Sequence, residues 1–212
     1  MAKYLRAATL LLVCVGGCAS APTYQGPVNY IAASPCVTGA SALSAASIPR
    51  TDKDGKVSTL AFDAHTPCIR DAEKPRPALL FSLAGISVPA EIQIATSGKD
   101  PVTLAPLLRV LGADFTELAH YPFEQFAKHG MDYSISIFIN PSTPAAAYLL
   151  VVADDSWLGK ANVNVAGKSR MMYVSNGVGA FTYNHGYEEK TVSTFSDVGS
   201  VTVRIRPPYS PK

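Results

Sequence analysis

The feature that most constrains the fold is an alternation of apolar and polar residues with a period of two. Residues 131–140 (MDYSISIFIN) place a tyrosine and three isoleucines on one side and polar residues on the other. Residues 88–95 (VPAEIQIA) and 200–206 (SVTVRIR) repeat the pattern. Because successive side chains of a β-strand point to opposite faces, this alternation predicts half-buried strands.

Two further segments are apolar enough to be buried strands. Residues 147–153 (AYLLVVA) are apolar on both faces, which predicts a central strand. Residues 102–111 (VTLAPLLRVL) predict a strand that is interrupted near Pro106, because proline cannot donate a ladder hydrogen bond. Turn-forming residues lie between the expected strands, at Lys53-Asp54-Gly55, Ser97 to Pro101, Asn140-Pro141, Asn176-Gly177 and Asp197-Val198-Gly199.

Helical periodicity is weak throughout the chain. The best candidate, residues 122–128 (PFEQFAK), allows one or two turns, and the Ala/Ser-rich residues 36–50 fit either a short helix or coil. Short strands separated by turns therefore predict an all-β fold, an antiparallel β-sandwich of the jelly-roll type with at most one or two short helices.

The amino terminus has the pattern of a bacterial lipoprotein signal peptide. Lys3 and Arg6 precede an apolar run over residues 7–15, and this run of about ten residues is shorter than the roughly 20 that span a bilayer. The sequence VGGC at 15–18 resembles a lipobox, in which Cys18 receives the lipid. The alternative is an ordinary secretory signal peptide cleaved after Ala21, in which Cys18 has no role.

Lipidation would fix both the location and the domain organisation of the protein. Each buried CH₂ of the acyl chains on Cys18 contributes about 0.8 kcal/mol to membrane anchoring. No acidic residue follows at position 19, which by resemblance to Gram-negative lipoprotein sorting implies an outer-membrane anchor facing the periplasm. We therefore expect a signal peptide over residues 1–17, the lipidated cysteine and a flexible tether over 18–50, and a folded domain over 51–212.

The charge of the mature chain argues against a nucleic-acid partner. Removing residues 1–17 takes away two of the 18 basic residues and none of the 16 acidic ones, so the remaining chain is formally neutral. A protein that binds nucleic acid usually carries an excess of basic residues to neutralise phosphates. We expect no nucleic-acid binding.

Two cysteines remain beside the proposed lipidation site once Cys14 leaves with the signal peptide. Cys36 and Cys68 are expected to form a disulfide, because the periplasm is oxidising. The loop that this bond closes would restrict the unfolded chain by roughly 3 to 4 kcal/mol. Free thiols and a metal site are the alternatives, but there is no CxxC motif and His65 stands alone near Cys68. We expect no metal.

Motifs of known enzyme classes are missing from the sequence. It contains no GxSxG, HExxH, SxxK or glycine-rich phosphate loop. The histidines are far apart in sequence, at His65, His120, His129 and His185. Asp154 and Asp155 are adjacent on the end of a strand and should point to opposite faces, so a solvated turn is preferred to an acid–base pair. The sequence predicts a non-enzymatic protein without a cofactor, with an unrecognised hydrolase as an alternative.

Aromatic residues are the best candidates for ligand binding, because ring faces stack on sugars. Trp157 lies in a polar stretch, ADDSWLGKAN, and Tyr183, His185 and Tyr187 lie in FTYNHGYEE. We predict Trp157, Tyr183 and Tyr187 as ligand-binding residues. The alternative for Trp157 is that its indole folds back onto the edge of the sandwich.

The order of these features from about residue 56 to residue 164 resembles the maltose operon periplasmic protein (MalM) family. No single motif is specific, and the order as a whole carries the resemblance. The similar segments are VPAEIQIATS (88–97), LAPLLRVLGADFTEL (104–118), HYPFEQFAKHG (120–130), MDYSISIFI (131–139), AYLLVVADDSWLG (147–159) and TFSDVGSVTVRI (194–205). The chain departs from the family in its lipobox, in its Cys36/Cys68 pair and in its shorter length.

The resemblance implies an accessory or binding protein in carbohydrate transport of the maltodextrin type. The family is exported to the periplasm, is associated with maltose and maltodextrin uptake, and has no established enzymatic activity, so it supplies no catalytic residues. The alternative is a structural component of a cell-envelope assembly that uses exposed strand edges near residues 190–206. The expected partners are a membrane, through the lipid on Cys18, and a glycan or a periplasmic protein.

Overall fold

Strands make up nearly all of the regular structure, as the alternating sequence predicts. The computed structural model describes residues 35–48, 59–71, 74–97, 102–141, 145–175 and 179–206. Within these residues several antiparallel sheets pack together, which confirms the predicted all-β sandwich. Helical structure there is limited to two 3₁₀ turns, η1 (Ala40–Ala42) and η2 (Phe123–Gln125). No helix in this part of the chain is long and apolar enough to cross a bilayer.

The largest sheet has seven strands among the described residues, in the order β1–β4–β5–β12–β8–β9, with β2 paired to β5. Its strands are β1 (Val37–Thr38), β2 (Ala46–Ser47), β4 (Cys68–Asp71), β5 (Lys74–Ser82), β8 (Pro106–Leu111), β9 (Glu117–Tyr121) and β12 (Tyr148–Ala153). β12 pairs with both β5 and β8, which confirms the predicted central strand. The predicted interruption near Pro106 is also present, because that proline begins β8 after a break in the strand.

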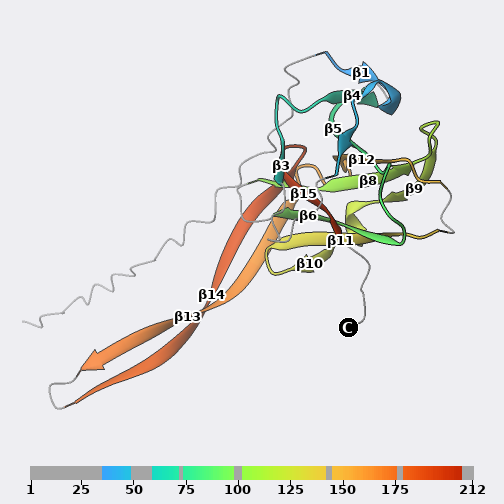
Figure 1. Cartoon of the computed structure of the whole chain (residues 1–212). Coiled ribbons are helices and arrows are strands. Elements are labelled where there is room, and N and C mark those ends of the chain that lie inside the picture. Colours follow the sequence, from blue (N-terminus) through green and yellow to red (C-terminus); the bar gives the residue numbers. More distant parts are fainter. Residues whose placement is uncertain are drawn as a thin grey trace, which may run out of the picture.

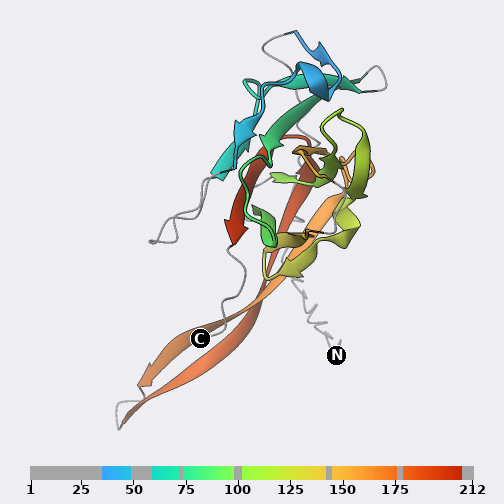
Figure 2. The same ribbon diagram turned by 45° about the vertical axis from the view of Figure 1, so that its right-hand side comes forward.

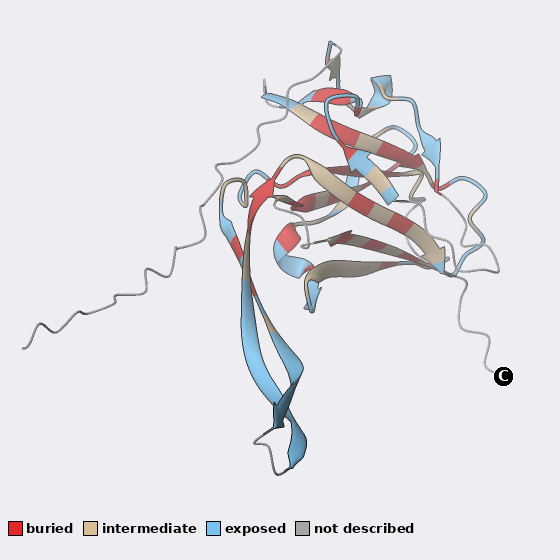
Figure 3. Ribbon diagram, turned by 90° about the vertical axis from the view of Figure 1, so that its left-hand side faces the viewer, coloured by how far each residue is buried: buried red, intermediate tan, exposed pale blue. Residues whose placement is uncertain are grey.

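The second sheet packs against the first and contains the strands with the clearest alternation. Its order is β10–β11–β6–β15–β3. These strands are β3 (Thr59–Phe62), β6 (Ala90–Ser97), β10 (Ala127–His129), β11 (Asp132–Ile139) and β15 (Gly199–Arg206). Burial alternates along β6, where Ile92 and Ile94 are buried and pair with Ile137 and Ile135 of β11. Figure 3 shows this alternation as bands of colour along the strands.

Apolar residues fill both sides of the seven-stranded sheet. The main core lies between the two sheets and contains side chains such as Phe81, Ile94, Leu108 and Val203. A second apolar cluster contains Leu80, Leu150 and Val152. Residues Val37, Ala40 and Leu43, from the amino-terminal end of the described chain, pack on this second cluster.

The amino-terminal boundary of the folded domain is therefore earlier than the sequence suggested. We expected residues 18–50 to be a tether, but β1 and β2 pair with β4 and β5, so residues 35–48 belong to the sandwich. Cys36 and Cys68 form the predicted disulfide, with Cα atoms 4.6 Å apart. The bond lies beside the parallel pairing of β1 with β4, in which Val37 is opposite Ile69. The prediction failed because small residues such as Ala and Ser fit both a tether and a short edge strand.

The third sheet contains a long hairpin that leaves the sandwich. It consists of β13 (Ala161–Ser175), β14 (Ala180–Ser196) and the short strand β7 (Val102–Leu104). β13 and β14 project away from the two packed sheets, as Figures 1 and 2 show from two directions. The predicted turn at residues 197–199 joins β14 to β15. Gly199 is required there, because its φ is 144° and a Cβ would lie 3.0 Å from the Leu104 nitrogen.

Candidate functional site

The projecting hairpin divides into two parts that differ in burial. We call residues 161–164 and 191–196 the base, and residues 165–175 and 180–190 the arm. Base residues 193–196 are buried, whereas every described residue of the arm is exposed except Ala166, which is partly buried. The two strands pair continuously from Ala161 opposite Thr194 to Ser175 opposite Ala180. The predicted turn at Asn176-Gly177 lies outside the described residues, between the last paired positions.

A buried polar network fixes the base. The Tyr133 hydroxyl donates to Asn162 Oδ1 at 2.6 Å, and Asn162 Nδ2 donates to Ser193 Oγ at 3.0 Å and Thr103 Oγ1 at 3.3 Å. The hydroxyls of Thr103 and Ser193 are themselves 3.0 Å apart. These residues come from four different strands, so the network ties β13 and β14 to β7 and β11. Buried polar groups that are fully paired in this way favour one geometry over alternatives.

An aromatic cluster supports the base from the side of the sandwich. The Trp157 ring meets Phe123 and Phe195 edge to face, with ring centroids 5.3 Å and 5.2 Å apart. The Lys160 ammonium lies 4.7 Å from the Trp157 ring centroid. Trp157 is thus partly buried against the main core, as in the alternative interpretation that its indole folds back onto the sandwich. The structure does not bring it together with Tyr183 and Tyr187, which lie on the exposed arm.

The two adjacent aspartates point in different directions and have different roles. Asp154 is buried and accepts hydrogen bonds from the Phe123 amide at 3.1 Å and from the Ser156 amide and hydroxyl at 3.0 Å and 2.6 Å. The Asp155 carboxylate is partly exposed and pairs with Arg76 at 2.6 Å. The predicted divergence is therefore present, but Asp154 is not solvated as a simple turn would be. It holds η2, and hence the aromatic cluster, against the end of β12.

The histidines are dispersed over the molecule. His120 lies on β9, where its Nδ1 is 3.1 Å from Glu117, and His129 lies on β10 in the other sheet. His65 donates its amide to Asp63, and His185 is exposed on the arm. Among the described residues no three His, Cys, Asp or Glu side chains are grouped so that they could hold a metal ion.

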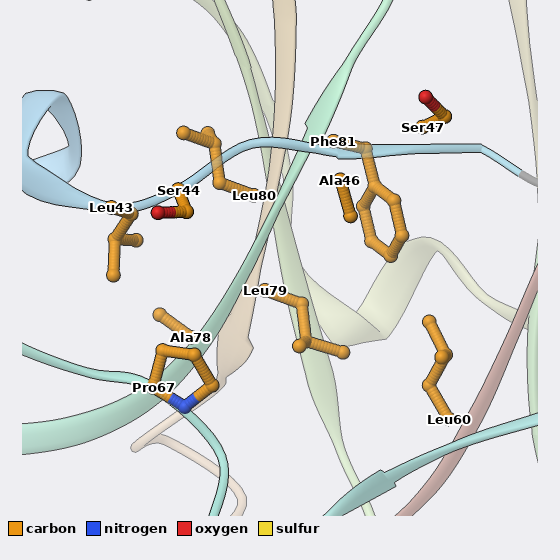
Figure 4. Close-up of a pocket in the computed structure, with 10 residues that line it drawn as sticks. All are labelled: Leu43, Ser44, Ala46, Ser47, Leu60, Pro67, Ala78, Leu79, Leu80 and Phe81. Atoms are coloured by element: carbon orange, nitrogen blue, oxygen red, sulfur yellow. The ribbon is translucent and has the colours of Figure 1, made fainter. Parts of the chain in front are cut away.

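Two small cavities of the described part differ in their lining. One of about 170 Å³ is lined mainly by apolar side chains, among them Leu43, Leu60, Leu79 and Phe81 (Figure 4). Its polar side chains are two serines, with no histidine, cysteine or carboxylate beside them. A second cavity of about 290 Å³ is lined by charged side chains, with Lys74 and Arg76 both paired to Asp155 and with Asp197 nearby. These side chains form a surface ion-pair cluster.

Most of the large apolar side chains that are exposed in the described residues lie on the arm. Because directly opposite residues of an antiparallel pair share a face, the register defines two faces of the arm. One face carries the cross-strand pairs Met172–Tyr183 and Val174–Phe181 near the free end, and the opposite face carries Met171 and Tyr173. All six side chains are exposed, and Tyr173 keeps 69% of its surface. We call residues 171–175 and 180–184 the tip.

Charged side chains occupy the middle of the arm. Arg170 lies opposite His185, and Lys168 lies opposite Tyr187, on the face that carries Tyr183 and Phe181. Lys168 forms an ion pair with Glu189, and its hydrogen bond to that carboxylate raises the pKa of the lysine. Tyr183 and Tyr187, both predicted as ligand-binding residues, thus share one face with Arg170 and His185 between them. The Phe181 and Tyr183 rings lie 6.3 Å apart.

The fold and the site together define an all-β sandwich with a projecting two-stranded arm that is apolar at its tip. Compared with protein-family models, curated proteins and solved structures, the chain matches none of them. The resemblance to the MalM family therefore stays a prediction.

Proposed function

We propose that the chain is a non-enzymatic, lipid-anchored protein of the cell envelope that faces the periplasm and acts as a structural adaptor. The arm is its docking element, and the lipid on Cys18 is its anchor. The observation that carries the proposal is the exposure of Met171, Met172, Tyr173 and Phe181 at the end of a hairpin fixed firmly at its base. This role is the structural alternative among the three that the sequence left open, beside the carbohydrate-transport protein and the unrecognised hydrolase.

The physical argument begins with the stability of the arm. An isolated two-stranded hairpin is marginally stable in water, and soluble proteins rarely expose large contiguous apolar patches. The core of the sandwich does not require the arm, because no arm residue belongs to either buried cluster of the described chain. A long hairpin with an apolar tip is therefore best explained by contact with something outside this chain.

The available strand edges also favour the arm as the docking element. We expected free edges near residues 190–206, but most of that stretch is already paired. Residues 194–196 pair with β7, residues 199–202 with β3, and residues 201–206 with β6. In the described structure, β13 pairs only with β14, so the outer edge of its arm residues 165–175 is open for strand addition. At the base the Val163 carbonyl already accepts a hydrogen bond from Lys128.

Glycan binding is a second candidate function, and the arrangement of rings on β14 favours it. Phe181, Tyr183 and Tyr187 lie on the same face of β14, with His185 between the two tyrosines, which suits stacking along an extended sugar chain. Calorimetric titration with maltodextrins tests this role. Binding that is lost in Tyr183→Ala and Tyr187→Ala supports it, and the absence of heat across the panel argues against it.

Photocrosslinking in living cells tests the adaptor role directly. A photoreactive amino acid replaces Phe181 in the arm, and the matched control replaces Phe138, which is similarly exposed on β11. We expect adducts with a partner protein or with phospholipid from the Phe181 position and none from the Phe138 position. Absence of any adduct along the arm, together with normal envelope integrity when residues 166–189 are deleted, would overturn the proposal.

The anchor has its own test. Labelled palmitate should be incorporated into the natural chain and not into Cys18→Ser, which should also be released from the membrane fraction. Equal labelling of both chains would remove the anchor from the proposal.

A further inference from the structure

The tip of the arm exposes large apolar side chains on both faces, and this limits the kind of surface it can contact. Met172, Val174, Phe181 and Tyr183 make one face apolar throughout, whereas Met171 and Tyr173 lie on the other face beside the polar residues Thr182, Asn184 and Ser175. A strand that docks on the surface of another protein usually needs one apolar face, with the other left polar for water. An element that exposes large apolar and aromatic side chains on both faces, with polar residues among them, is suited instead to the boundary between water and an apolar medium.

The basic residues next to the tip indicate that the surface it contacts is negatively charged. The sequence from Ser169 to Tyr187 contains no acidic residue, and the cross-strand pair Arg170 and His185 lies immediately behind the tip. Arg170 makes no ion pair within the described residues, in contrast to Lys168, which is held by Glu189. Apolar and aromatic residues followed by cationic ones are the arrangement that binds the interface of anionic membranes.

We propose that the tip inserts into the interfacial layer of a phospholipid bilayer, with Arg170 and His185 at the level of the headgroups. This inference rests on the proposed function, because it names what the arm contacts. The outer edges of β13 and β14 carry unpaired backbone groups, which cannot enter the hydrocarbon core. Insertion is therefore shallow, on the order of 5 to 10 Å, as for other interfacial elements. The Tyr173 and Tyr183 hydroxyls then remain among the headgroups, where tyrosine is enriched.

Quenching by brominated lipids tests insertion in the protein as cells make it. The lipidated chain is reconstituted into vesicles of phosphatidylethanolamine and phosphatidylglycerol, with bromine at defined positions along the acyl chains. Three single variants add a second tryptophan: Phe181→Trp on one face of the tip, Tyr173→Trp on the other face, and Phe138→Trp as the matched control on β11. All three sites are exposed and outside the core, and Trp157 supplies the background emission of the natural chain.

The expected result is loss of the added emission in both Phe181→Trp and Tyr173→Trp, strongest with bromine near the headgroup end of the acyl chain. The emission added by Phe138→Trp should remain. Quenching of one tip face alone would mean that the arm lies flat, and quenching of all three would mean that the whole domain rests on the surface. Either outcome overturns the inference.

Failure of this inference can be distinguished from failure of the proposed function. An arm that is not quenched in any vesicle, yet still gives crosslinked protein adducts from the Phe181 position in cells, overturns membrane insertion and leaves the adaptor role in place. An arm that gives neither signal overturns both.

Discussion

Strands β13 and β14 reverse the usual distribution of polar and apolar residues between their base and their tip. At the base, Asn162 and Asn164 are buried, with 2% of their surface exposed. At the tip, Met171 and Tyr173 each keep 69% exposed. Buried polar residues and exposed large apolar residues are the two departures from the hydrophobic pattern that carry information. The comparison teaches that the base is built to hold one orientation and that the tip is built to contact something else.

The base and the tip should differ most in how much a large-to-small substitution lowers the free energy of unfolding. Phe195→Ala removes a ring that contacts Phe123, Tyr133 and Trp157 in the buried base. We expect it to lower the free energy of unfolding by about 3 to 5 kcal/mol. Phe181→Ala at the tip removes a ring of the same size and should change that free energy by no more than about 0.5 kcal/mol. Urea unfolding followed by Trp157 emission measures both, and equal losses would contradict the division into base and tip.

The Cys36–Cys68 disulfide stabilises the sandwich and does not contact the arm. Removing it therefore tests whether the arm depends on the stability of the sandwich. Replacing Cys36 and Cys68 with alanine should lower the free energy of unfolding by roughly 3 to 4 kcal/mol, because the unfolded chain gains freedom. The quenching of Phe181→Trp by brominated lipids should be unchanged in this background at temperatures where the domain stays folded. Loss of that quenching in a folded variant would show that the arm depends on the far end of the sandwich.

Asn162→Ala tests the polar network of the base, with a smaller expected loss of stability than Phe195→Ala. The substitution removes the partner of the Tyr133 hydroxyl and leaves the Ser193 hydroxyl with Thr103 alone, so we expect a loss of about 1 to 3 kcal/mol in the free energy of unfolding. Asn184→Ala, on the exposed arm, is the control and should have little effect. A double-mutant cycle with Ser193→Ala separates the shared interaction from the individual costs, and additive losses would argue against a network.

Much of the sandwich was predictable because its information is local. The alternation in residues 131–140 predicted the strand observed as β11, and the apolar residues 147–153 predicted the central strand β12. The disulfide was predicted from the two cysteines Cys36 and Cys68. Each prediction needed only strand periodicity or cysteine chemistry. Residues 35–48 were misassigned because small residues do not distinguish a tether from a short edge strand.

The base and the arm were not predictable because their burial is set by distant segments. Asn162 is buried only because Thr103 and Tyr133 come from strands far along the chain. Trp157 lies in a polar stretch of sequence, yet Phe123 and Phe195 enclose its ring. No local pattern marks a hairpin whose outer half meets no other strand. A turn signal at Asn176-Gly177 between two long stretches without helical periodicity was the only available hint.

The smallest expected effect concerns the ion pair between Lys168 and Glu189, midway along the arm. The hydrogen bond to Glu189 raises the pKa of Lys168 above its ordinary value of 10.5. A raised pKa in the folded state means that any stabilisation is present below that ordinary value and is lost as pH rises through the folded pKa. Both side chains are exposed, so water and salt screen the pair and its effect on unfolding should be negligible at neutral pH. Glu189→Gln should return the lysine pKa towards 10.5, as measured by NMR titration of the Lys168 side chain, without changing the unfolding midpoint at pH 7. A clear shift of that midpoint would instead show that the middle of the arm is stabilised like the base, and the boundary between the two parts would have to move outward.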